Sequence, residues 1–251
     1  MFFKRYRLPL LVSCLMLLPL TAAAYSNADM EKVRSGASCP GGDLAGADFS
    51  NLDLSGRDFT GADFTEARLY KTILDKAELT GANFKSALLH KTSLRGAKLD
   101  NCDFSYAAAA GADFTNATLT GAKLYRSQLA GASFLNATLK NAELQEAGLD
   151  DVKADFADFS FANLPYAWLR RGSFKNAVFY GANLYSAHLE KSDLADADLR
   201  STRLGKSKLN YALLSRTQFD GAMLDNADLR GAKLDYTEFG NAFKDKAIFD
   251  N

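Results

Sequence analysis

The chain has 251 residues, of which 47% are apolar and 24% are charged, with 30 basic and 30 acidic side chains. This balance lacks both the basic excess of a nucleic-acid-binding protein and the strong acidity of a nucleic-acid mimic, so we expect no nucleic-acid partner. The length is sufficient for one large core or two small domains.

The first 24 residues are typical of a secretory signal peptide. Three basic residues between positions 4 and 7 precede an apolar run over 8–20, and three alanines at 22–24 suit a signal peptidase. The apolar run has 13 residues, whereas a membrane-spanning helix needs roughly 20, so no membrane span is expected. We therefore predict cleavage near Ala24 and a periplasmic or secreted protein.

Residues 11–14 (LVSC) also resemble a lipoprotein box, which would place a lipid on Cys14. Cleavage before Cys14 would leave a very short apolar segment in the signal peptide. It would also leave the apolar residues 15–20 at the N-terminus of the mature protein. A lipoprotein is therefore the minor alternative. Removal of residues 1–24 leaves 27 basic and 30 acidic residues, a net charge of about −3.

Residues 25–41 precede the repeats described below and are predicted to cap the fold at its N-terminal end. Ser26 and Asp29 have the spacing of a helix start, and Gly36 can end the helix. We expect a short helix that covers the first coil.

From residue 42 to residue 251 the sequence repeats every five residues without a phase slip. The central position is Leu or Phe in 39 of 42 units, and the residue two positions earlier is small in 40 of them. Residues five apart spread around a helix and alternate between the faces of a straight strand, so neither element buries this pattern. A short extended stretch followed by a corner buries both positions. The repeat therefore predicts a coil of short strands.

A second, longer period of four units lies on top of the first. A corner two residues after each centre favours Gly or Asn. In the series of every fourth corner that starts at Gly61, eight of ten residues are Gly or Asn. In the equivalent series that starts at Gly46, only two of eleven are. Four units therefore make one turn of the coil.

The unit A-(D/N)-(L/F)-x-x resembles the pentapeptide-repeat family over residues 42–251, as in Ala47-Asp48-Phe49. The resemblance implies an all-β fold, a right-handed quadrilateral β-helix solenoid of about ten coils with a short N-terminal capping helix. Five positions depart from the pattern: Ala109, Ala154 and Lys244 at centres, and Leu52 and Arg57 at small positions.

Little in the sequence indicates catalysis. Each predicted coil turns four large and four small side chains inward, which leaves no room for a ligand. Cys39 and Cys102 should lie about 14 Å apart, too far for a disulfide. His90 and His188 should lie about 24 Å apart, cannot share a metal, and are expected to be solvated. We therefore predict no enzyme, cofactor, catalytic residue or metal ligand.

Five aspartates occupy consecutive outward positions around the first coil: Asp43, Asp48, Asp53, Asp58 and Asp63. Such a ring of carboxylates can attract a cation. Asp is also well suited to turns, and we favour this second interpretation.

Residues 152–171 form an unusual coil, because Phe156, Phe161 and Tyr166 occupy three successive corners. Large aromatic side chains beside Arg are typical of surfaces that anchor protein partners. For Phe156 we favour another interpretation, in which the ring folds inward over the small centre Ala154. The candidate partner surface comprises Phe161, Tyr166, Trp168, Arg170 and Arg171.

The C-terminal coil contains Phe243, Ile248 and Phe249. Exposed strand edges at the end of a solenoid can cap themselves, fray or pair with a second copy. These three residues are therefore candidates for self-association as a homodimer.

The leading functional hypothesis is an exported, non-enzymatic structural or interaction module that binds a protein partner through an outer face. The family resemblance offers an alternative, since its quinolone-resistance members are topoisomerase-protecting DNA mimics. That alternative implies a cytoplasmic, strongly acidic rod, whereas this sequence carries an export signal and a net charge near −3.

Overall fold

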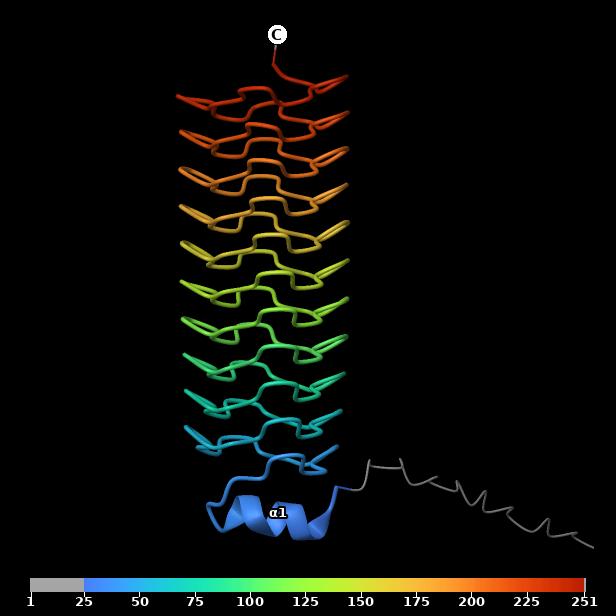
Figure 1. The fold of residues 1–251 in the computed structure, drawn as a ribbon, viewed down its shortest axis with the longest axis vertical. Coiled ribbons are helices and arrows are strands. Elements are labelled where there is room, and N and C mark those ends of the chain that lie inside the picture. The colour runs from blue at the N-terminus through green and yellow to red at the C-terminus, as the bar shows by residue number, and fades with distance from the viewer. Residues whose placement is uncertain (1–24, 251) are drawn as a thin grey trace, which may run out of the picture.

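The computed structural model describes residues 25–250; the predicted signal peptide, with Cys14 and Ala24, lies outside them. The described chain winds into a straight rod (Figure 1). Helix α1 (Asn27–Arg34) lies across one end of this rod, and the C-terminus lies at the other. Within residues 25–250 no helix is long and apolar enough to cross a membrane.

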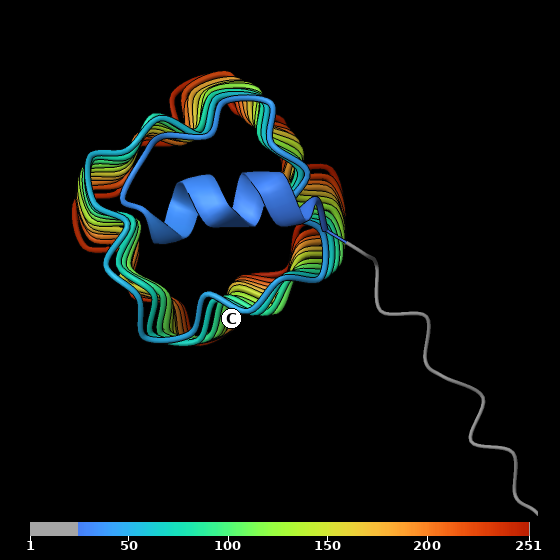
Figure 2. The same cartoon turned by 90° about the horizontal axis from the view of Figure 1, so that it is seen from below.

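Each turn of the rod takes four of the five-residue units and contains four parallel bridges. Every bridge joins residues four units apart, from Asp43 with Asp63 to Asp228 with Ile248. Seen along the axis, the coils superpose in one four-lobed outline (Figure 2). Stacked rings in adjacent coils, such as Phe64 and Phe84, have centroids 4.8 Å apart, the normal spacing of strands in a sheet. The two periods in the sequence thus correspond to one side and one turn of the rod.

The centres and small residues point inward, as predicted, except that Leu52 at a small position of the first coil is exposed. Leu124 and the other centres from Leu44 to Leu229 are buried, and those of the last coil are partly exposed. Most buried hydroxyls at small positions donate to backbone carbonyls, as where Thr72 donates to the carbonyl oxygen of Phe49 at 2.8 Å; the Ser207 hydroxyl has no partner among the described residues. Cys102 occupies a small position, and burial raises the pKa of its thiol to about 12. Both Cys102 and Cys39 are free and buried.

Corner residues two after each centre adopt a left-handed backbone conformation. Their φ angles lie between 52° and 71° from Gly46 to Lys246, except at the last Gly-Asn corner, where Gly240 takes the positive φ instead of Asn241. Most of these residues are not glycine, and each such residue accepts a conformation that costs about 1–2 kcal/mol. The repeated ladder imposes it, and the corner side chains project outward.

The N-terminal cap forms as its sequence predicts. The Ser26 hydroxyl oxygen accepts a hydrogen bond from the N–H of Asp29 at 3.3 Å, and Met30 and Val33 are buried against the rod. Gly36 follows the helix with a φ of 89°. The chain then enters the ladder directly, because the N–H of Cys39 donates to the carbonyl of Asp58 at 2.8 Å.

Arg57, which departs from the small-residue pattern, links the first coil to α1. Its Nη1 donates to the carbonyl oxygen of Val33 at 2.7 Å, and its Nη2 donates to the carbonyl of Asp53 at 3.2 Å. A cation at the C-terminal end of a helix also interacts favourably with the helix dipole. A large residue fits here because the first coil is covered by a helix and not by another coil.

Candidate functional site

A shallow groove of about 490 Å³ lies on one corner of the rod and is lined by Glu146, Tyr166, Trp168 and His188. We refer to these four residues as the aromatic groove. Tyr166 is 53% exposed and Trp168 is 40% exposed. Two members of the predicted partner surface therefore meet in one depression, and they come from adjacent positions of the same coil.

Trp168 is held rigidly by its neighbours. Its indole stacks on the His188 ring with centroids 4.1 Å apart and an interplanar angle of 12°. The Arg170 guanidinium lies 4.6 Å from the indole centroid, in the range of a cation–π contact. A large aromatic side chain with fixed rotamers loses little entropy on binding, so Trp168 is suited to anchor a partner.

His188 is not solvated, contrary to the expectation from sequence. Its side chain is only 20% exposed, and Nδ1 lies 3.1 Å from Oε1 of Glu190. The ring is packed because Trp168 occupies the same position in the preceding coil, directly beside it in the ladder.

The two arginines of the predicted surface are paired with carboxylates of the preceding coil. Arg170 donates from Nε to both carboxylate oxygens of Asp150 at 3.1 Å. Arg171 donates to Asp151 from Nε at 2.7 Å and from Nη2 at 2.6 Å. Each pairing holds the pKa of the arginine above its usual range, chiefly through the side-chain hydrogen bond. Both guanidinium groups are therefore oriented, and neither is a free cation.

Phe161 lies at the preceding corner of the coil, away from the aromatic groove. Its ring packs edge-on against Tyr180, with centroids 5.5 Å apart, and covers the backbone of Gly181 in the next coil. The structure therefore separates Phe161 from the other predicted surface residues.

Phe156 does not fold inward, so the interpretation favoured from sequence is wrong. Its side chain is 61% exposed, while Ala154 is completely buried. The left-handed corner, with a φ of 61°, directs the Phe156 side chain away from the core.

The aspartates of the first coil serve their own turns. Asp48 and Asp53 each accept a hydrogen bond from the N–H two residues later at 2.9 Å. Hydrogen bonds from the neighbouring serine side chains chiefly hold the pKa of both carboxyls below the usual value. Within residues 25–250 no group of three His, Cys, Asp or Glu side chains is placed to hold a metal ion.

The C-terminal candidates point in different directions. Phe249 turns inward and packs edge-on against Phe239, with centroids 5.8 Å apart. Phe243, which is 62% exposed, and Ile248 lie on neighbouring outer faces of the last coil. Only Phe249 therefore belongs to the interior at this end of the rod.

Sequence reasoning missed Glu146, Asp150, Asp151 and His188 as parts of the site. The signal was present, because each stands four units from a residue that was identified: Tyr166, Arg170, Arg171 and Trp168. In a four-sided coil, residues four units apart in the sequence are thus neighbours in adjacent coils, and such contacts can be predicted from the sequence.

A four-sided rod of stacked five-residue units around a filled core defines a β-helical solenoid. The family model described as "Pentapeptide repeats" matches in eight copies between residues 35 and 235. The chain belongs to the pentapeptide-repeat family, and its fold is the right-handed quadrilateral β-helix that the resemblance implied.

Solved structures of the family are similar to this chain. HetL, a pentapeptide repeat protein involved in heterocyst differentiation regulation in the cyanobacterium Nostoc, is 25% identical with a TM-score of 0.65. The alignment covers 90% of this chain and 97% of HetL. QnrB1, a plasmid-mediated fluoroquinolone resistance protein, is 18% identical over 82% of this chain and 94% of its own, with a TM-score of 0.41. No curated protein sequence matches the chain significantly.

Proposed function

We propose that this chain is an exported, non-enzymatic interaction module that binds a protein partner through the aromatic groove. The observation that carries the proposal is the Trp168 indole, exposed at the surface yet fixed between His188 and Arg170. Aromatic and Arg side chains dominate the binding energy of protein interfaces. The core beneath the groove is already filled by Leu164 and Leu169, so the exposed rings are available for recognition.

The test is a Tyr166→Ser, Trp168→Ser double variant. We expect it to keep the wild-type melting curve and to lose capture of its partner from a native envelope extract, because anchors of this kind contribute about 2 kcal/mol or more each. Tyr106→Ser is the matched control. Tyr106 occupies the same corner three coils earlier, and its ring packs edge-on against Tyr125 as that of Tyr166 does against Tyr185. Unchanged capture by the double variant would remove the groove as the binding site.

Export is the second part of the proposal and rests on residues 1–24. Mass spectrometry of the mature protein should find its N-terminus at Tyr25 or close to it. A lipid-modified Cys14 would show instead that the protein is membrane-anchored.

The topoisomerase-protecting alternative makes an opposite prediction. A DNA mimic should protect gyrase from quinolones when the chain is produced in the cytoplasm. We expect no protection, because a net charge of about −3 on the mature chain provides little resemblance to the phosphate backbone.

A homodimer through the C-terminal end also remains a proposal. The partial exposure of the core residues Leu234, Phe239 and Phe249 favours it. Light scattering over a range of protein concentrations should show a dimer mass that Phe249→Ser reduces to that of the monomer.

A further inference from the structure

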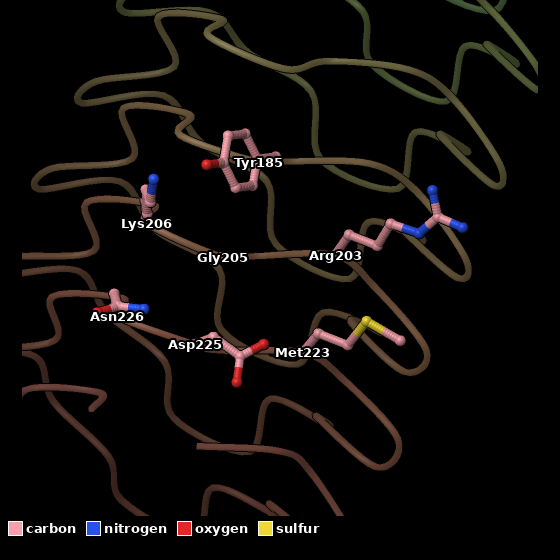
Figure 3. A pocket seen from close by; sticks show the side chains of 7 residues that line it. All are labelled: Tyr185, Arg203, Gly205, Lys206, Met223, Asp225 and Asn226. Atoms are coloured by element: carbon pink, nitrogen blue, oxygen red, sulfur yellow. The ribbon is translucent and has the colours of Figure 1, made fainter. Parts of the chain in front are cut away.

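A second hollow lies on the same corner of the rod as the aromatic groove, nearer the C-terminus. It has a volume of about 190 Å³, and Gly205 forms its floor (Figure 3). Tyr185 and Asp225 lie on either side of this floor along the rod axis, because they hold the equivalent position in the coils before and after. We call this depression the Gly205 hollow.

The hollow exists because Gly205 lacks a side chain where most other coils have one. Tyr125 and Gln145, for example, stand in the same column of the corner. A Cβ at Gly205 would lie only 3.2 Å from Cδ2 of Tyr185. The Tyr185 ring therefore lies against bare backbone, and the space beside it stays open.

The side walls of the hollow combine apolar surface with positive charge. Arg203 and Met223 lie on one side, and Lys206 and Asn226 lie on the other (Figure 3). The Met223 side chain is exposed, and the thioether of Met adapts readily to the shape of a partner. The Lys206 ammonium lies 5.5 Å from the Tyr185 ring centroid.

Arg203 and Lys206 differ from the neighbouring arginines in forming no ion pair with a carboxylate among residues 25–250. Arg200, Arg216 and Arg230, in the same part of the rod, each form an ion pair with an aspartate. Within the described chain, the rim of the hollow thus carries two unpaired cations and only one carboxylate, that of Asp225.

We propose that the Gly205 hollow receives a large apolar side chain of a protein partner that carries an acidic residue next to it. A cavity of about 150 Å³ holds benzene, so this hollow accommodates a Phe or Leu side chain. The largely apolar lining binds the side chain, and Arg203 and Lys206 attract the carboxylate. Because the two depressions share a corner, we take the partner to be the one in the proposed function, and in this respect the inference rests on that function. Binding of an apolar side chain at the hollow is independent of it.

The probe is the acetylated and amidated dipeptide Phe-Glu, compared with Phe-Lys, titrated into the ¹⁵N-labelled protein. We expect Phe-Glu to shift the amide signals of Gly205 and Asn226 and to bind at least about threefold more tightly than Phe-Lys, a difference in line with partly exposed ion pairs.

Two variants and a control locate the binding. Gly205→Gln fills the hollow with a residue that the same column already holds at Gln145, so we expect the fold to persist and the shifts to disappear. Arg203→Glu should remove the preference for Phe-Glu. Lys123→Glu makes the same change of sign in the same row as Arg203, four coils earlier, and should leave binding unchanged.

Equal shifts in the Gly205→Gln variant, equal binding of Phe-Lys, or no shifts at Gly205 would each overturn the proposal. So would signals at Gly205 that change with protein concentration alone, because the occupant would then be a second copy of the chain. If the dipeptide fails while partner capture still depends on Tyr166 and Trp168, this inference falls and the proposed function stands. If the dipeptide binds at the hollow while partner capture does not depend on Tyr166 and Trp168, only the proposed function is overturned.

Discussion

The first coil, residues 42–61, and the aromatic coil, residues 152–171, have the same backbone conformation, and nearly all their differences lie in the outward side chains. In the first coil the outward aspartates hydrogen bond to their own turns, as Asp48 does to Ser50. In the aromatic coil outward side chains contact the neighbouring coils, as Trp168 does with His188 of the next coil and Arg170 with Asp150 of the preceding one. The interior of this rod is therefore nearly the same in both coils while its exterior differs, so the two can change independently.

The interior should give the largest effect on stability. Leu124→Ala removes a fully buried centre, and we expect the free energy of unfolding to fall by about 2–5 kcal/mol. Lys123→Ala, its exposed neighbour, should change it by no more than about 0.5 kcal/mol. Urea denaturation measures both, and similar losses at the two positions would contradict the separation of inside from outside.

The contact between the first coil and α1 should give the next largest effect. Arg57→Ala leaves the half-buried carbonyl of Val33 without its charged donor, so we expect a loss of about 1.5–3 kcal/mol. Arg216→Ala, which breaks an exposed ion pair with Asp196, is the control and should cost less than about 1 kcal/mol. Hydrogen exchange should show faster opening of α1 only in the Arg57 variant.

In the aromatic coil, replacement of an exposed corner should not destabilise the protein. Phe156→Gly relieves a left-handed conformation that costs about 1–2 kcal/mol, against about 0.5–1 kcal/mol for the greater freedom of unfolded glycine. We therefore expect a gain of up to about 1.5 kcal/mol in the free energy of unfolding, measured by thermal denaturation. A clear loss of stability would show that this ring supports the coil above Ala154.

The smallest effect should come from acidification of the first coil. Hydrogen bonds from Ser50, Ser55 and Thr60 hold the pKa of Asp48, Asp53 and Asp58 below 3.8 in the folded protein. Since a depressed pKa stabilises the folded state only above the unfolded value, this contribution is complete at neutral pH and is lost below about pH 4. Urea midpoints at pH 7, 5 and 3 should be constant between the first two and lower at the third. A triple Asp→Asn variant should show a smaller decline.

Most of the fold could be predicted from the sequence because nearly every unit repeats the same pattern of buried and exposed residues. The large centre and the small residue beside it specify the inside of each turn, and the four-unit period of Gly and Asn specifies four sides. Arg57 was harder to interpret, since its reason for being large lies in α1 and not in the repeat.

The candidate site was only partly predictable. Tyr166 and Trp168 stood out because their coil carries aromatic side chains at three successive corners and the single Trp of the sequence. The Gly205 hollow could not be predicted, because glycine next to a corner normally indicates a turn. Its meaning depends on the Tyr185 ring, which lies against it in the preceding coil. Phe156 was misread because the backbone conformation of its corner is not apparent from one residue.

Because the ladder repeats strictly every four units, the number of units sets both the length of the rod and the direction in which later side chains point. Deletion of four consecutive units from the middle shortens the protein by one coil, 4.8 Å between stacked rings, and leaves every later side chain on its original side. Deletion of a single unit removes one side of a coil and turns everything beyond it by a quarter of a revolution relative to α1. The distance and the orientation of the aromatic groove relative to α1 can therefore be set separately, by choosing how many units precede it.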